Sequence, residues 1–236
     1  MTPYKLAYRI RKRTKTNSNT YSDTDLLIDI GVEMDDLSVR IAQVYEGYFG
    51  VYSLRDLVAD TREYPLPEDL LNHLYGIEAK LDGSNWKWLK EFDLNMYQRA
   101  TDETTILAQF AGLDPMYDLF RGSAFIYSDT AIIGVTEGLK LWHSAYPQHP
   151  TDLTENAVDL STPPSEEQTG FPRQFHKILE RKVSRGFKER NNIKLAKDED
   201  EVVLEKDIEN AMEAIGSMNA DRSIIGSLPY EDGADY

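Results

Sequence analysis

The stretch that decides the fold runs from Thr61 to Tyr146, and it opens with TREYPLPEDLL (residues 61–71). Pro65 and Pro67 have no backbone N–H to give to a central sheet ladder, so this opening predicts an extended lead-in rather than a core strand. Six segments rich in aromatic and β-branched residues follow it and predict strands. They are Leu74–Leu81, Trp86–Phe92, Met116–Phe120, Ala124–Ser128, Ala131–Val135 and Leu139–Tyr146.

Residues that accept a positive backbone φ separate these segments. Asp82-Gly83 and Arg121-Gly122 carry the strongest turn signal, and Asp129-Thr130 and Glu137-Gly138 carry a weaker one. Short strands at this spacing, without helical segments between them, favour antiparallel sheets packed as a sandwich or a partly open barrel. We therefore expect residues 59–150 to form an antiparallel β module.

An amphipathic helix is predicted before the β module. Ser22 supplies an N-cap hydroxyl, and Asp25 is an acidic residue three positions later. An apolar stripe follows, and Gly47 and Gly50 are expected to end the helix. The stripe comprises Leu26, Ile30, Met34, Leu37, Ile41, Val44 and Tyr48. Packing within one subunit and a ring seam between subunits share this periodicity, so both interpretations stay open.

Two further helices are predicted after the β module. The first starts near Pro172 and is expected to pack on the N-terminal helix. Its apolar face comprises Phe171, Phe175, Ile178, Leu179, Val183 and Phe187. The second is marked by Leu204, Ile208, Ala211, Met212 and Ile215, and it is expected to stop at Gly216.

The predicted fold class is therefore α+β. It is a helical bundle, with an N-terminal helix and long C-terminal helices, that carries an inserted antiparallel β-sandwich or barrel-like module. The predicted parts are a basic flexible arm (1–20), a helical domain (21–58 and 170–216), the β module (59–150), an irregular connector (151–169) and a C-terminal tail (217–236). The tail contains apolar residues that are expected to order on a partner: Ile224, Ile225, Leu228, Tyr230 and Tyr236.

Charge is distributed unevenly along the chain, whose formal net charge is −15. Basic residues dominate the N-terminal arm, whereas acidic residues dominate residues 198–213. This asymmetry favours head-to-tail contact between subunits or a charged partner for each end, and two solvated ends are the alternative. The arm residues that could contact a partner or DNA are Arg9, Arg11, Lys12, Arg13 and Lys15. Because the rest of the chain is acidic, tight sequence-specific binding of duplex DNA is not expected.

The sequence supplies few groups for catalysis or metal binding. The absence of cysteine excludes disulfides, thiolate ligands and cysteine nucleophiles. The four histidines, His73, His143, His149 and His176, include no pair at the i, i+4 spacing of a helical zinc motif. No phosphate-binding loop, dinucleotide fingerprint or serine nucleophile elbow is present, and a glycosidase carboxylate pair has only the abundance of acidic residues behind it. We expect no enzymatic activity, no metal and no cofactor.

No apolar run reaches the roughly 18 residues of a membrane span, so no membrane contact is expected. The aromatic residues leave two interpretations open. Trp86, Trp88 and Trp142 with Tyr64, Tyr75 and Tyr97 could form a stacking platform for sugars or single-stranded nucleic acid. Core packing is favoured, because Trp86 and Trp88 share one face of a strand and one face of a sandwich must be apolar.

Three blocks of sequence resemble the head-to-tail connector (adaptor) proteins of tailed bacteriophages. The first is YSDTDLLIDI (21–30). The second is ADTREYPLPEDLL (59–71), followed by GIEAKLDG (76–83) and IGVTEGLKLW (133–142). The third runs from YP (146–147) through TDLT (151–154) to GFPRQFHKIL (170–179). Together the blocks cover most of residues 21–190.

The resemblance implies a virion neck protein that is made in the host cytoplasm and forms a ring, typically of twelve copies in this family. Its implied partners are the portal protein, adjacent copies of itself, a downstream neck or tail protein, and passing double-stranded DNA without sequence specificity. The apolar residues of the tail are the expected portal-docking residues. Two alternatives stay open: a head-closure or tail-completion protein of the same neck and, outside the virion, a carbohydrate-binding β-sandwich protein.

Overall fold

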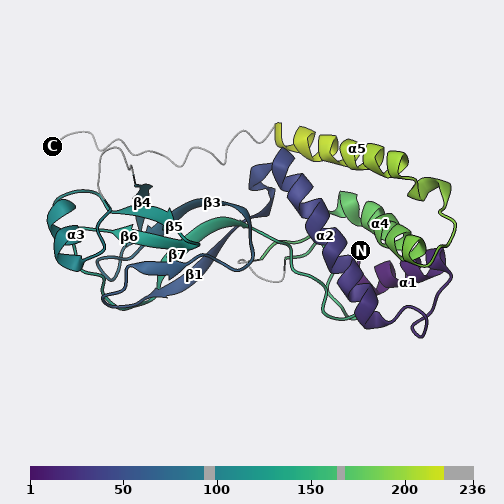
Figure 1. Cartoon of the computed structure of the whole chain (residues 1–236), viewed down its shortest axis with the longest axis horizontal. Coiled ribbons are helices and arrows are strands. Elements are labelled where there is room, and N and C mark those ends of the chain that lie inside the picture. Colours follow the sequence, from purple (N-terminus) through teal and green to yellow (C-terminus); the bar gives the residue numbers. More distant parts are fainter. Residues whose placement is uncertain (93–98, 164–167, 221–236) are drawn as a thin grey trace. The chain divides into compact units, whose positions relative to one another are not determined.

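The computed structural model describes residues 1–92, 99–163 and 168–220, which fold as two compact units. The helical unit comprises Met1–Tyr45, His149–Thr162 and the described residues from Phe171 onward. The sheet unit comprises the described residues of Glu46–Gln148 and Pro163–Gly170. Figure 1 shows the elements of both units.

In the described part of the chain, helices and short 3₁₀ turns make up the helical unit (Figure 1). They are α1 (Pro3–Thr14), α2 (Asp23–Val44), η2 (Arg173–Phe175), α4 (His176–Arg190), η3 (Lys197–Glu199) and α5 (Glu201–Ala220). α4 packs against α1, α2 and α5, so it forms the centre of the unit. The predicted packing of the second helix on the first is thereby confirmed.

The predicted apolar stripes lie in the core of the helical unit, except for Val44, which is 58% exposed, and Tyr48, which follows the end of α2 and lies in η1 of the sheet unit. Ser22 caps α2 by accepting a hydrogen bond from the backbone N–H of Asp25, at 3.1 Å, as its spacing predicts. Of the stripe residues of α2 and of the segment that runs from Phe171 into α4, those at most 3% exposed are Leu26, Ile30, Met34, Leu37, Ile41, Phe171, Phe175, Ile178, Leu179 and Val183. Because these side chains are buried within one chain, a seam between subunits would have to use other residues.

Most of the predicted flexible arm is instead the helix α1. Thr2 provides the N-cap, and Pro3 occupies the first turn, where its missing N–H is not needed. Leu6 and Ile10 are fully buried, and α1 packs on α4. The interpretation of residues 1–20 as a flexible arm is therefore wrong for Pro3–Thr14, because the few apolar residues among the basic ones fall on one helix face.

Two predicted helix ends are also wrong. α2 ends at Val44, before either glycine, with the N–H of Tyr45 bonded to the carbonyl of Ile41 at 2.8 Å. The 3₁₀ turn η1 (Glu46–Phe49) follows it and belongs to the sheet unit. α5 continues through Gly216, which does not adopt the positive φ that would terminate a helix.

The sheet unit contains one seven-stranded mixed sheet with the order β1-β7-β3-β4-β5-β6-β2. The strands are β1 (Gly50–Leu57), β2 (Glu63–Pro65), β3 (Leu70–Ala79), β4 (Lys87–Glu91), β5 (Met116–Phe120), β6 (Ser123–Tyr127) and β7 (Val135–Ala145). All neighbours pair antiparallel except β4 and β5, which are parallel. Parallel neighbours need a crossover, and the helix α3 (Glu103–Gln109) lies in this one.

The sheet curls around an apolar core (Figure 1). Leu57 of the edge strand β1 and Ile126 of β6, which neighbours the other edge strand, belong to the same buried cluster as Ile77 and Leu141. β6 alternates between two environments, because its Phe125 and Tyr127 point away from this cluster and pack with Phe110, next to α3. α3 and its neighbours therefore cover the outer side of the sheet near β6.

Only the class α+β of the predicted fold agrees with the structure, and the predicted architecture is wrong. The β module is a single curled mixed sheet rather than an antiparallel sandwich, and its parallel pair depends on α3, which the sequence interpretation missed. The α-helices of the helical unit are also short, from 12 residues in α1 to 22 in α2. No long-helix bundle is therefore present in the described residues. β1 was missed as well, and its partner β7 is distant in sequence.

The turn chemistry is confirmed in part. Arg121 (φ 51°) and Gly122 (φ 78°) form a two-residue hairpin turn between β5 and β6, and Gly83 (φ 84°) follows β3. Glu137 also has a positive φ, of 48°, but it lies inside β7 rather than in a turn. The pairing of β1 with β7 shifts register near this point, so the irregularity falls inside one strand. The predicted strand Ala131–Val135 is wrong, because residues 131–134 are not in a strand and Val135 is the first residue of β7.

Candidate interaction surfaces

The outer side of β1, β7, β3 and β4 carries a cluster of aromatic side chains around Lys140, and Lys80 also lies 4.5 Å from the ring centre of Trp86. Strand alternation sends Leu139 and Leu141 of β7 into the core and Lys140 and Trp142 to the opposite side. Cross-strand pairing then places Tyr52 directly opposite Trp142. We call this surface the tryptophan face, and it comprises Tyr52, Glu78, Trp86, Trp88, Lys140 and Trp142.

Lys140 holds the tryptophan face together. Its ammonium lies 4.4 Å from the ring centre of Trp86 and 5.3 Å from those of Tyr52 and Trp142. Its Nζ also pairs with a carboxylate oxygen of Glu78 at 3.3 Å. Cation–π contacts of this kind are each worth about 0.5–1 kcal/mol at exposed sites. One lysine therefore orients three rings from different segments.

A glycine makes room for the fourth ring. A Cβ atom on Gly76 would lie 2.1 Å from the nearest ring atom of Trp88, so the indole packs flat against the β3 backbone. Trp86 and Trp88 are nevertheless 37% and 41% exposed. The prediction that they pack in the core is wrong: the two residues do share a face, but it is the outer one. Tyr64 is a core residue, and Tyr97 lies outside the described residues.

The helix α2 presents a second apolar stripe to solvent. Ile28, Val32 and Val39 are 59%, 62% and 38% exposed. At about 100° per residue, these positions fall on the side of α2 opposite its buried stripe. A surface helix normally carries polar residues on that side, so α2 is apolar on two opposite faces. Exposed apolar side chains gathered in this way mark a contact for another protein surface.

The oppositely charged ends of the sequence meet inside the helical unit. Arg13 of α1 pairs with Asp198 at 2.7 Å and with Glu199 at 3.2 Å. Arg11 donates to the backbone carbonyl of Tyr21 at 2.9 Å, and Arg9 lies 3.5 Å from Glu180. Much of the charge asymmetry is therefore neutralised within one chain.

Glu199 is the centre of this ionic network and is fully buried. Its carboxylate accepts hydrogen bonds from the ammonium of Lys188 at 2.7 and 2.8 Å and from the backbone N–H of Ala196 at 2.8 Å. Lys188 is itself only 6% exposed. A buried charge is tolerated only with such partners. The network therefore fixes η3 against α4 and α1, and no sequence pattern indicated it.

The remaining predicted site residues divide into two groups. In the basic segment, Lys12 and Lys15 are exposed, whereas Arg11 and Arg13 are used in the internal contacts described above. The predicted portal-docking residues Ile224, Ile225, Leu228, Tyr230 and Tyr236 lie outside the described residues.

The histidines occupy four separate environments. His143 is fully buried in the sheet unit, with Nδ1 3.0 Å from the carbonyl of Leu141, and the ring of His73 lies 5.2 Å from that of Tyr75 at a tilted angle. In the helical unit, His149 pairs with Asp35 at 2.7 Å. Across residues 1–92, 99–163 and 168–220, no three His, Asp or Glu side chains are grouped to hold a metal ion.

The protonation of His176 and Tyr21 is shifted by burial. Burial and the ammonium of Met1, 2.9 Å from Nδ1, lower the pKa of His176 to about 4. Its Nε2 donates to the carbonyl of Phe171 at 3.2 Å, so the neutral ring is satisfied on both sides. Burial and the hydrogen bond to Asp29 raise the pKa of Tyr21 well above its ordinary value. Both groups stabilise the helical unit in their neutral forms.

No protein-family model matches the sequence, and no curated protein matches it either. Among the described helices, none combines the length and the apolar composition needed to cross a bilayer.

Proposed function

We propose that this chain is a structural protein of a tailed-phage neck. Copies of it assemble side by side into a ring that docks on the portal protein, connects the head to the tail and lines the DNA channel. The proposal combines the resemblance of three sequence blocks to the connector family with the exposed apolar stripe of α2.

The outward stripe of α2 carries this proposal. Ile28, Val32 and Val39 are 59%, 62% and 38% exposed and lie outside the buried core of their own chain, yet they are apolar on a helix whose inner stripe is already buried. An assembling protein keeps such a stripe because a neighbour covers it, and burying it contributes about 25 cal/mol per Å² of apolar surface. A protein that works alone gains nothing from exposing it.

The charge of the chain is compatible with a DNA channel. The formal net charge is −15, and affinity for the phosphate backbone comes from cationic contacts. A ring with an acidic lining would repel the genome and let it pass without adhering. Portal docking is assigned to residues 221–236, whose apolar side chains follow the last described residue, Ala220.

The mass distribution of the protein mixed with the portal ring from the neighbouring reading frames tests the proposal. We expect a discrete shift equal to a whole number of copies, compared with either component alone. Val32→Asp should abolish ring assembly on the portal, because it places a charge in the stripe. Val202→Asp is the matched control, since Val202 is a 76% exposed valine on α5. No mass shift with both components folded would overturn the proposal.

The tryptophan face favours a second candidate, a carbohydrate-binding protein outside the virion. Trp86 and Trp88 are exposed rings on a sheet, held by Lys140 and backed by Gly76, and exposed aromatic rings of this kind stack on sugars. A glycan panel read by tryptophan fluorescence tests this candidate. Binding that is lost in Trp88→Ala and kept in Tyr4→Ala would support it, and an unchanged spectrum across the panel would reject it.

A further inference from the structure

α1 has an outward face that is opposite in charge to the outward face of α2. The sequence of α1 contains five basic residues and no acidic one, whereas α2 contains six acidic residues and one basic residue. Five of the six α2 acids pair within the chain, with Arg11, Arg190, Lys182 and His149, which leaves Asp25 as the acidic residue of α2 available to a neighbour. Within each copy, contacts with α4 occupy the inner sides of both helices. The outward faces therefore point away from α4, and the two cannot cover each other within one copy.

The outward face of α1 combines aromatic and basic side chains. Tyr4 and Tyr8, 39% and 62% exposed, are one turn apart, and Lys12 continues the same line one turn further. Lys5 lies beside them and is exposed. Neither lysine forms an ion pair with any residue in the described parts of the chain. Their charges, unlike those of Arg11 and Arg13, are not neutralised internally.

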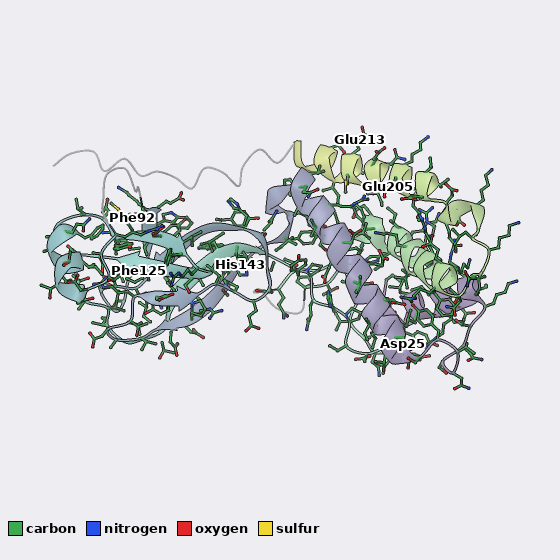
Figure 2. The ribbon with its side chains drawn as sticks, viewed as in Figure 1. Asp25, Phe92, Phe125, His143, Glu205 and Glu213 are labelled. Atoms are coloured by element: carbon green, nitrogen blue, oxygen red, sulfur yellow. The ribbon has the colours of Figure 1, made fainter. Side chains whose placement is uncertain are left out.

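The outward face of α2 is complementary in size and in charge. Ile28 and Val32 are also one turn apart, and Val39 continues their line. Asp25 is exposed at the first turn of α2, beside this line, as Figure 2 shows. Between Asp23 and Val39 the helix has no basic residue. Over these turns each face extends roughly 12–17 Å, at about 1.5 Å per residue.

We propose that the α1 face of one copy (Tyr4, Lys5, Tyr8 and Lys12) packs on the α2 face of the next copy (Asp25, Ile28, Val32 and Val39). The tyrosine rings cover the aliphatic stripe, and the lysines meet Asp25, the acidic residue of α2 that no internal ion pair occupies. This inference rests on the proposed function, because it identifies the neighbour in the ring. Two different faces make a heterologous contact, and repeating such a contact generates a closed ring when the rotation between copies allows it.

Cysteine cross-linking tests the pairing directly, because the natural chain contains no cysteine. A chain with both Tyr8→Cys and Val32→Cys should form a ladder of disulfide-linked oligomers on mild oxidation, free at high concentration or on the portal ring. Tyr8→Cys with Val202→Cys is the matched control and should stay monomeric. A mixture of the two single variants Tyr8→Cys and Val32→Cys should give one cross-linked dimer and nothing larger.

Two outcomes would overturn the pairing. Cross-linked dimers from Val32→Cys alone would mean that α2 packs on α2 of its neighbour. A portal mass shift without any ladder would mean that the protein docks through other faces, so the proposed function would stand and this pairing would fail. A ladder in the free protein without a portal mass shift would support the pairing and reject the portal role.

Charge reversal separates the ionic rim from simple apolar contact. The double variant Lys5→Glu and Lys12→Glu should reduce the ladder at least tenfold at low salt, whereas Lys5→Arg with Lys12→Arg should retain it. An unchanged ladder in the glutamate variant would reject the charge complementarity on which the choice of partner depends.

Discussion

The two units of this protein differ in the charge that they bury: the sheet unit buries the guanidinium of Arg62 beside the exposed carboxylate of Glu103, whereas the helical unit buries both partners of an ion pair. The helical unit buries an ionic network around Glu199 and exposes Ile28 and Val32 on α2. The sheet unit buries a hydrocarbon cluster that contains Ile77 and Leu141, and it exposes tryptophans. Each unit therefore has a surface whose composition differs from that of an ordinary solvated face.

The difference shows how each unit is specified. Hydrocarbon packing tolerates changes of shape, whereas a buried carboxylate is satisfied in few geometries, so the Glu199 network orders the short η3 against α4 with little room for alternatives. In the sheet unit, strand pairing already fixes the geometry. At the tryptophan face Lys140 and Lys80 both lie over aromatic rings, so there the cations arrange rings instead of elements. The predictions below test this contrast.

The largest expected effect comes from breaking the buried network. Glu199→Ala leaves Lys188 buried without its carboxylate, and the free energy of unfolding should fall by about 3–5 kcal/mol. Urea denaturation followed by circular dichroism measures the change. Glu209→Ala, an exposed acidic residue on α5, is the control and should change stability by less than about 0.5 kcal/mol. A loss below about 1 kcal/mol for Glu199→Ala would mean that water or rearrangement replaces the carboxylate easily.

Truncation in the sheet core should have a comparable but more variable effect. Leu141→Ala removes a fully buried side chain from the inner cluster, and it should cost about 2–5 kcal/mol through the cavity that it leaves. Leu119→Ala, at a 44% exposed position on β5, is the matched control. Equal costs for the two leucines, measured by denaturant unfolding, would contradict the assignment of the inner face of the sheet.

Stability should depend on pH through His176. The pKa of the folded ring is about 4 and that of the unfolded ring is about 6.5, so between these values the unfolded chain binds more protons. The contribution is fully present above pH 6.5 and is lost as the pH falls toward 4, a change of about 2–3 kcal/mol.

Unfolding free energies measured across this pH range for the parent and for His176→Gln check the effect of His176. In the variant, the free energy of unfolding should no longer fall as the pH decreases from 6.5 to 5, a range in which few carboxylates titrate. His149→Gln, which alters the histidine paired with Asp35, should keep it. If both variants follow the parent, buried His176 does not set the slope.

The smallest expected effect is at the tryptophan face. Gly76→Ala forces the exposed ring of Trp88 to move, because the new Cβ would lie 2.1 Å from it. We expect a stability loss of about 1 kcal/mol together with a clear change in tryptophan emission. Gly186→Ala is the control, since no atom lies within 4 Å of a Cβ at that position. An unchanged emission spectrum would show that Trp88 does not pack on β3.

Local patterns predicted the elements that depend on local chemistry. The N-cap at Ser22, the buried stripe from Leu26 to Ile41 and the hairpin turn at Arg121-Gly122 each follow from a few neighbouring residues. β5 and β6 follow from the same kind of signal, since alternation and a two-residue turn define both.

Features that depend on contacts between residues far apart in the chain could not be predicted from local patterns. Alternation placed Trp86 and Trp88 on one face but could not say which face is inner, because α3 covers only part of the outer side. The pairing of β1 with β7 joins residues far apart in the chain, and the Lys188–Glu199 pair depends on a fold in which η3 returns to α4. The sequence indicated the aromatic residues of the tryptophan face. It indicated none of the residues in the outward stripe of α2.

The order of the strands has a consequence for association between molecules. β1 and β2 are the two edges of the sheet, and they differ in how well they could accept a further strand. β2 has only three residues, ends at Pro65 and is followed by Pro67, so it offers few free N–H groups. β1 offers eight residues. Among the described strands, β1 is therefore the edge that could pair with a strand of another molecule. Association through this edge stops at a dimer, because growth of a fibre by strand addition requires two free edges in each molecule.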